Sequence, residues 1–223
     1  IGHSARDTFS MLYQHGLPMQ PKAFAVGVRI EHPQEMINQD QYGKNYPSFL
    51  PAAPYKLTAN LDNGRGVYTF CMCPGGYVVN ASSEEHRLAV NGMSYSRRDS
   101  QNANTAVIVT VSPDDFGSDH PLAGVEFQRK LEEAAYLEGN GKVPVQLFGD
   151  FCENRPSVQL GTVTPHIKGM YQLANVRNIF PEFIAESLTE GIQIFDRKLP
   201  GYARCDAVIS GVESRTSSPV RLI

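Results

Sequence analysis

The sequence predicts an α+β fold, in which a mainly antiparallel β-sheet is followed by, and packed with, two long helices, and one short helix lies near the N-terminus. Short segments rich in Val, Ile, Thr and aromatic residues come first and are bounded by turn residues, which is typical of strands. Two longer segments follow with apolar residues at helical spacing, at residues 121–138 and 181–198. The chain has neither a G-x-G-x-x-G sequence after a strand nor a G-x-x-x-x-G-K-S/T sequence. We therefore do not expect it to hold a dinucleotide by a phosphate loop of its own.

The composition is that of a globular domain. Of the 223 residues, 41% are hydrophobic and 19% are charged, and the formal net charge is -3. Basic and acidic residues are mixed along the chain, so neither nucleic acid nor a membrane surface is an expected partner. No apolar run reaches the ~20 residues that span a bilayer. The four cysteines are too few for a disulfide scaffold, which favours a cytoplasmic protein.

The N-terminal residues predict a helix over residues 4–15. Ser4-Ala5-Arg6-Asp7 has the pattern of a capping box, and Gly16 can end the helix. Ile1-Gly2-His3 would then be a strand end with a tight turn, a place where helix N-termini bind anions, although a plain helix start explains these residues equally well. The chain has no initiator methionine and no signal peptide, and we expect it to be cut from a longer protein.

Seven strands and a second short helix are expected in the rest of the chain. A short helix should follow residue 34, before an irregular stretch with several prolines. The expected strands cover residues 23–30, 55–61, 66–73, 77–81, 87–90, 106–111 and 207–212.

Two cysteines in one of these strands are the most informative feature. Alternation places Cys71 and Cys73 on one face of the strand, with Phe70 and Met72 on the other. The pair is too close to form a disulfide comfortably in an extended strand. No second close pair exists to complete a zinc site, so no metal is expected, although Cys152 and Cys205 could in principle supply further ligands.

The turn that follows this strand contains Pro74, Gly75 and Gly76 and leads into a new strand at Tyr77. One interpretation is an ordinary hairpin whose cysteines are small buried hydrophobic residues. The other is a functional site, because a planar ligand or another chain segment could approach the bare glycine backbone closely. Cys71, Cys73 and His3 are the candidate catalytic residues, each on weak grounds, since no Ser/His/Asp set or carboxylate pair is visible.

Four sequence motifs together closely resemble those of a family of FAD-dependent proteins, the NAD(FAD)-utilizing dehydrogenases. They are Gly2-His3-Ser4-Ala5-Arg6-Asp7, Phe70-Cys71-Met72-Cys73-Pro74-Gly75-Gly76, Asn91-Gly92-Met93-Ser94 and Gly211-Val212-Glu213-Ser214-Arg215-Thr216-Ser217-Ser218-Pro219-Val220-Arg221. The resemblance extends along the whole chain.

This resemblance implies that residues 1–223 are the central, substrate-side or cap domain of a larger flavoprotein oxidoreductase. Residues 1–16 and 207–223 would be seams with a missing FAD-binding part of the same polypeptide. FAD is implied for the full-length parent and is not expected in this chain, which should be inactive alone. An unidentified small molecule would be the substrate.

The resemblance also implies which residues face the FAD-binding part: Gly2, His3, Ser4, Gly75, Gly76, Arg215, Thr216, Ser217 and Ser218. If the segment is inserted into one FAD domain, residues 1–4 and 212–216 should lie within roughly 15–20 Å of each other. Two alternatives remain open. The domain could be a non-catalytic module that binds a ligand or partner, or it could carry a thiol or zinc site on the Cys-x-Cys strand.

Overall fold

A computed structural model describes residues 2–223 and confirms an α+β fold with a mostly antiparallel sheet packed against helices. The elements, including two short 3-10 helices (η), are α1 (Arg6–Gln14), β1 (Met19–Pro21), β2 (Phe24–Pro33), α2 (Gln34–Tyr42), β3 (Thr58–Asn60), β4 (Gly66–Cys73), β5 (Tyr77–Asn80), β6 (Val90–Met93), β7 (Asn102–Val111), η1 (Pro113–Phe116), α3 (Ala123–Glu138), β8 (Val143–Leu147), α4 (Phe148–Cys152), β9 (Ile167–Lys168), β10 (Tyr171–Leu173), η2 (Val176–Ile179), α5 (Glu182–Asp196), β11 (Val208–Glu213) and β12 (Val220–Leu222).

The main sheet has seven strands in the order β10-β8-β11-β2-β7-β4-β3. All neighbouring strands are antiparallel except β10 and β8, which are parallel. Its centre is the pair of ten-residue strands β2 and β7, which are in register from Phe24↔Val111 to Pro33↔Asn102. Two smaller sheets accompany it, one of order β6-β5-β9 and one formed by β1 and β12.

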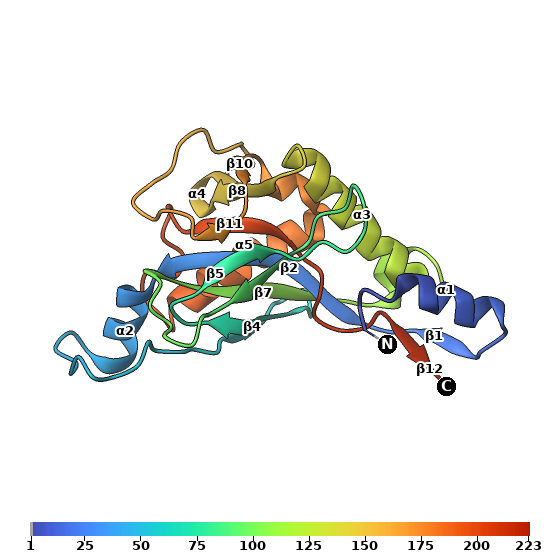
Figure 1. Cartoon of the computed structure of the whole chain (residues 1–223), viewed down its shortest axis with the longest axis horizontal. Coiled ribbons are helices and arrows are strands. Elements are labelled where there is room, and N and C mark those ends of the chain that lie inside the picture. Colours follow the sequence, from blue (N-terminus) through green and yellow to red (C-terminus); the bar gives the residue numbers. More distant parts are fainter. Residues whose placement is uncertain (1) are drawn as a thin grey trace.

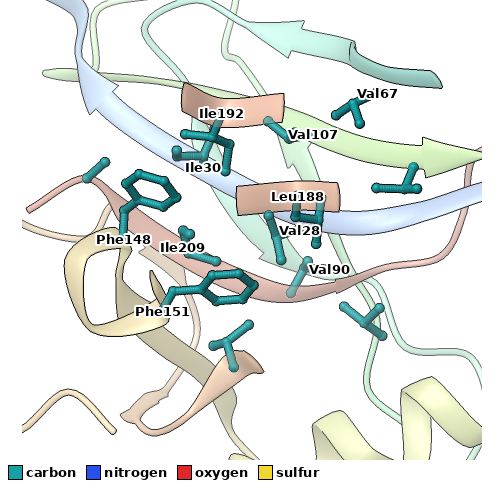
Figure 2. Close-up of a cluster of buried hydrophobic side chains, with 14 of the residues drawn as sticks. Val28, Ile30, Val67, Val90, Val107, Phe148, Phe151, Leu188, Ile192 and Ile209 are labelled. Carbon is teal, nitrogen blue, oxygen red and sulfur yellow. The ribbon is translucent and has the colours of Figure 1, made fainter. Parts of the chain in front are cut away.

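One face of the main sheet forms the hydrophobic core against α5 (Figure 1). The pairs Val28↔Val107 and Val67↔Val109 place four valines on this face, because residues directly opposite each other point the same way. Helix α5 buries Leu188 and Ile192 against it, four residues apart along one side of the helix. Figure 2 shows Val28, Val67 and Val107 close to Leu188 and Ile192.

The opposite face of the main sheet is covered by β5, β6 and α3. It buries a small apolar cluster of Ala25, Ala106 and Ile108 and also several polar groups. Arg29 and Glu31 of β2 point to this face, and neither side chain is exposed to solvent. In Figure 1 the strand β5 lies in front of β2 and β7, whereas α5 lies behind them. The two faces thus have different roles: one provides packing energy and the other holds buried polar groups.

The predicted helices are confirmed, with one correction at the N-terminus. Residues 121–138 and 181–198 contain α3 and α5, and α2 begins at Gln34. Helix α1, however, begins at Arg6, and its N-cap residue Ala5 has no side-chain cap hydrogen bond. The expected capping box of Ser4 and Asp7 is therefore wrong. The hydroxyl of Ser4 instead accepts a hydrogen bond from Arg215, and Asp7 accepts one from the amide of Thr8.

Several strand boundaries also differ from expectation. Strand β2 continues through His32 and Pro33 instead of ending before them, and β7 begins at Asn102. The strand expected over residues 87–90 is found at Val90–Met93. It extends to Met93 by pairing with β5, and Gly92 leaves room for Arg29, since a Cβ atom on Gly92 would lie 2.4 Å from the guanidinium. Strands β1, β8, β9, β10 and β12 were not expected, since they are short or contain proline.

The packing of α5 on β4 predicts the effect of one substitution. A Cβ atom on Gly191 would lie 2.5 Å from Cγ1 of Val67. We expect Gly191→Ala to lower the free energy of unfolding by about 1–3 kcal/mol through overpacking, even though alanine favours helix by about 1 kcal/mol over glycine. Urea unfolding measures this. Gln193→Ala, at an exposed position of the same helix, is the control and should change stability by no more than about 0.5 kcal/mol.

Candidate functional site

The Cys-x-Cys strand is interrupted by a β-bulge. Phe70 pairs with Ala106 and the next pair is Cys73 with Asn104, so two residues of β4 lie opposite Thr105 alone. Cys71 is one of them and has a φ of 45°. One extra residue moves all later side chains to the other face. The predicted placement of Cys71 and Cys73 on one face is therefore wrong: Cys73 shares the face of Phe70.

The predicted turn at Pro74-Gly75-Gly76 and the new strand at Tyr77 are confirmed, but the interpretation of this turn as an ordinary hairpin is wrong. The turn carries the chain out of the main sheet, because β5 pairs with β6 and β9 and not with β4. Both glycines are buried, and a Cβ atom on Gly75 would lie 1.8 Å from the carbonyl oxygen of Arg98. The space that a planar ligand would need at this turn is thus filled by the chain itself.

Arg29 connects the bulge to the C-terminal motif. Its guanidinium is completely buried and forms an ion pair with Glu213, with 2.8 Å between Nε and Oε2. Its remaining partners come from three other strands: it donates to the Cys71 carbonyl at 2.8 Å, to Asn91 Oδ1 at 2.9 Å and to Asn104 Oδ1 at 3.1 Å. One side chain therefore joins β2 to β4, β6, β7 and β11. Burial raises the pKa of Glu213, and the charge of Arg29 offsets part of this effect.

A second buried arginine, Arg6, belongs to a neighbouring cluster. Glu213 binds Arg29, whereas the next residue, Ser214, binds the carboxylate that pairs with Arg6. The two terminal nitrogens of Arg6 donate to Oε2 and Oε1 of Glu132, at 2.8 and 2.7 Å, and Arg6 also pairs with Glu84. Ser214 donates to Glu132 Oε1 at 2.6 Å. Burial alone would raise the pKa of Glu132. Hydrogen bonds from His3 and Arg6, together with the charge of Arg6, lower it to about 2.

His3 lies between two guanidinium groups. Its Nε2 is 2.9 Å from Arg6 and 3.3 Å from Glu132, and its Nδ1 is 3.2 Å from Nε of Arg215. A neutral imidazole has only one acceptor nitrogen, so it cannot accept from both arginines at once. His3 therefore bridges Arg215 and the Glu132 carboxylate. Only one of its two arginine contacts can be a hydrogen bond at a time, so the other can be given up. The expected proximity of the two seam segments is confirmed for residues 3, 4, 214 and 215; Ile1 lies outside the described residues.

Arg215 has no carboxylate partner among residues 2–223, and it is partly exposed. Two of the hydroxyls beside it are already used by the backbone. Thr216 donates to the Ala25 carbonyl at 2.6 Å, and Ser218 donates to the Val220 carbonyl at 2.9 Å. Ser217 has no side-chain hydrogen bond within the described chain, and Gly2 is exposed.

The cysteines do not assemble into one site. Cys71, Cys152 and Cys205 are exposed and Cys73 is partly buried, and each is a free thiol. Burial raises the pKa of Cys73, and the nearby Arg29 offsets part of this rise. In the described part of the chain no three His, Cys, Asp or Glu side chains are grouped as metal ligands. Within residues 2–223 no helix is both long and apolar enough to cross a bilayer.

Three residues hold this site together and were not among the predicted site residues: Arg29, Glu132 and Glu213, the last of which lies within a quoted motif. The signal was available for one of them. Arg29 interrupts the apolar run of a strand whose neighbours are all buried, and a charge in such a place requires a partner. The identity of that partner depends on strand order, because Glu213 is 184 residues away.

Removing the charge of Arg29 tests this network. We expect Arg29→Met to lower the free energy of unfolding by about 3–5 kcal/mol, because Glu213 and two amide oxygens lose their buried donors. Urea unfolding measures the loss. Arg197→Met, at an exposed position that follows α5, is the control and should cost at most about 0.5 kcal/mol. The double variant Arg29→Met, Glu213→Met should recover part of the loss. A loss for Arg29→Met no larger than for the control would contradict the role of Arg29.

Glu31 makes stability depend on pH. Burial raises its pKa to about 7, and hydrogen bonds from Asn102 and the His166 amide offset only part of this. At pH values between the ordinary pKa of glutamate and about 7, Glu31 keeps its proton in the folded protein, whereas the unfolded chain has released it. The stabilising effect is therefore complete at low pH and is lost as pH rises through about 7.

We expect Glu31→Gln to remove this dependence. The free energy of unfolding of the variant minus that of the unsubstituted chain should increase by about 2–3 kcal/mol from pH 5 to pH 8. Burial lowers the pKa of neighbouring His32 to about 4, but His32 is present in both proteins and cancels in the difference. Denaturant unfolding at both pH values measures the effect. A difference that does not change with pH would show that Glu31 titrates normally.

Two comparisons with known proteins show which family the chain resembles. The family described as "FAD-dependent protein, C-terminal domain-like" matches residues 23–216. An uncharacterized protein of Clostridium beijerinckii (strain ATCC 51743 / NCIMB 8052) is 55% identical over 227 residues. That alignment covers 100% of this chain but 42% of the relative, so the chain spans less than half of that protein's length. Because the family match includes most of the chain, the protein belongs to the FAD-dependent protein, C-terminal domain-like family.

Proposed function

We propose that this chain is the substrate-side domain of an FAD-dependent oxidoreductase of the NAD(FAD)-utilizing dehydrogenase type. In this proposal FAD is held mainly by another part of a longer parent polypeptide. Family membership supports the flavoprotein context, and the greater length of the relative leaves room for such a part. The observation that carries the proposal is the meeting of His3 and Ser4 with Ser214 and Arg215 on one side of the molecule.

The chemistry of this seam fits one end of a phosphate-bearing cofactor. Arg215 is partly exposed and has no carboxylate partner in residues 2–223, and guanidinium groups bind phosphate oxygens with paired hydrogen bonds. Ser217 offers a hydroxyl, and Gly2 offers bare backbone. Thr216 and Ser218 would shape the loop, because their hydroxyls hold the chain's own carbonyl groups. Gly75 and Gly76 have no place in this site, since other residues cover them.

Bound flavin would supply hydride transfer, and the residues of this chain would position it. Glu132 is fixed by Arg6 and Ser214 and accepts from His3, and His3 in turn contacts Arg215. When Arg215 binds an anion, its contact with His3 Nδ1 can be released. That nitrogen would then be free to accept a proton or hydrogen bond from a group at the seam. His3 is accordingly a positioning residue in this proposal, with Nδ1 as its one atom open to chemistry.

The thiols support a structural role better than a redox role. Burial raises the pKa of Cys73, so it is protonated at neutral pH, and only thiolates are good nucleophiles. Cys71 is exposed, but its carbonyl is what Arg29 binds. The alternative of a non-catalytic binding module therefore remains as the second candidate.

The low number of cysteines supports a cytoplasmic location.

The test is the flavin content of the longer parent. We expect the purified parent to show a stoichiometric flavin absorbance band that NADH or NADPH bleaches without oxygen, whereas the 223-residue chain is colourless. Arg215→Met in the parent should weaken flavin binding by about 10–100-fold, the usual cost of losing a charged hydrogen bond. Flavin titration followed by fluorescence measures this change.

Arg197→Met is the matched control, because Arg197 is exposed and follows α5. A parent without flavin would overturn the proposal. If Arg215→Met leaves the flavin affinity unchanged, Arg215 does not bind the cofactor and that part of the proposal is wrong. Turnover of a Cys71→Ser, Cys73→Ser parent decides the role of the thiols: we expect it to fall less than about threefold, and a loss of activity with flavin retained would favour a redox role.

A further inference from the structure

The two-stranded sheet of β1 and β12 lies outside the domain that defines the family. The family match ends at residues 23 and 216, whereas β1 is Met19–Pro21 and β12 is Val220–Leu222. The two strands pair with each other and with no strand of the main sheet. Figure 1 shows them at one extremity, beside α1 and both marked chain ends. A two-stranded sheet of this size is marginally stable in water unless other elements cover it.

One edge of this sheet is open on β12. Backbone hydrogen bonds join Lys22 to Pro219 and Ile223 to Pro18, at 2.9 and 3.1 Å. Antiparallel pairs alternate between bonded and non-bonded positions, so Val220 and Leu222 direct their N–H and C=O groups away from β1.

These two positions differ in how their outward groups are satisfied. The Ser218 hydroxyl binds both backbone groups of Val220, accepting at 3.2 Å and donating at 2.9 Å. Leu222 therefore carries the free donor and acceptor of this edge. On the opposite edge of the sheet, β1 has Pro21 at an outward position, and proline has no N–H to offer.

Apolar side chains are also exposed in the segments that carry this sheet and in the helix before it. Five of the twelve exposed large apolar residues fall in the short segments outside the family match, although these segments are a small part of the chain. They are Met11, Tyr13, Leu17, Leu222 and Ile223. On its inner side the sheet is properly packed, since Met19 and Val220 are buried with Phe9 and Val125. Within these segments the exposed apolar residues therefore lie on α1, just after it at Leu17, and at the end of β12.

We propose that the free edge of β12, at Leu222, receives a strand from the FAD-binding part of the longer parent, which also covers these apolar side chains. This inference rests on the proposed function, because it takes the parent to contain that part. Strand addition to an open edge provides main-chain hydrogen bonds, and neighbouring apolar residues provide burial. The relative is long enough to supply the added strand and the residues that bury these side chains, since this chain covers 42% of it. A second copy of this chain is the alternative occupant.

Proline substitutions test the edge. Leu222→Pro removes the outward N–H without touching the bonds to β1. Asn60→Pro is the matched control on β3, an edge strand of the main sheet. There the bonds Leu61 N to Arg65 O and Thr69 N to Leu57 O, both 2.9 Å, make Asn60 an outward position too.

In the parent, we expect Leu222→Pro to lower Tm by at least about 3 °C more than Asn60→Pro. In the 223-residue chain the two variants should agree within about 1 °C. A second measurement needs no substitution and so cannot be lost to misfolding: hydrogen exchange of the Leu222 amide should be at least about tenfold slower in the parent than in the chain.

Each outcome has a distinct meaning. Equal Tm losses for the two proline variants in the parent, or equal exchange of Leu222 in parent and chain, would overturn the docking proposal, whether or not the parent binds flavin. A parent with no flavin but a protected Leu222 would support docking while overturning the proposed function. A dimer of the 223-residue chain that Leu222→Pro dissociates would show that a second copy occupies the edge, which also overturns the proposal.

Discussion

The guanidinium of Arg29 is a full positive charge in the middle of the main sheet, and the surrounding structure has to stabilise it there. Moving such a charge from water into a protein interior costs several kcal/mol unless it is paired and hydrogen-bonded. The carboxylate of Glu213 provides the pair, and oxygen atoms from three other strands accept the remaining hydrogen bonds. The bulge in β4 is part of this solution, because it presents the Cys71 carbonyl to the guanidinium.

The same requirement explains why the conspicuous motifs meet. Asn91 and Gly92 belong together because Asn91 binds Arg29 and Gly92 leaves room for it. Glu213 is followed by Ser214, whose hydroxyl binds Glu132, so the first buried ion pair is adjacent to the second one formed by Arg6. His3 and Arg215 lie at the outer end of this series. A polar layer of this kind fixes the relative positions of β4, β6 and β11 more strictly than apolar packing would.

This arrangement gives the two faces of the sheet separate tasks. The face against α5 is apolar and contributes the packing that stabilises the domain. The other face carries a series of buried charged groups that ends at Arg215, which has no carboxylate partner in the described chain. The Cys-x-Cys strand adds little chemistry to this face, because burial raises the pKa of the Cys73 thiol and the chain itself fills the space at the glycine turn.

The sequence alone determined the fold class and the long helices, because helical periodicity over residues 121–138 and 181–198 leaves few other ways to bury their apolar faces. It also indicated that His3, Ser4 and Arg215 belong to one site, through motifs that the structure brings into contact. The tertiary structure decided the rest. Alternation in β4 fails at Cys71 because Arg29 binds a carbonyl there, and the Pro-Gly-Gly turn leaves the sheet because residues 93–98 pack on it. Both facts depend on partners distant in sequence, and local pattern carries no information about them.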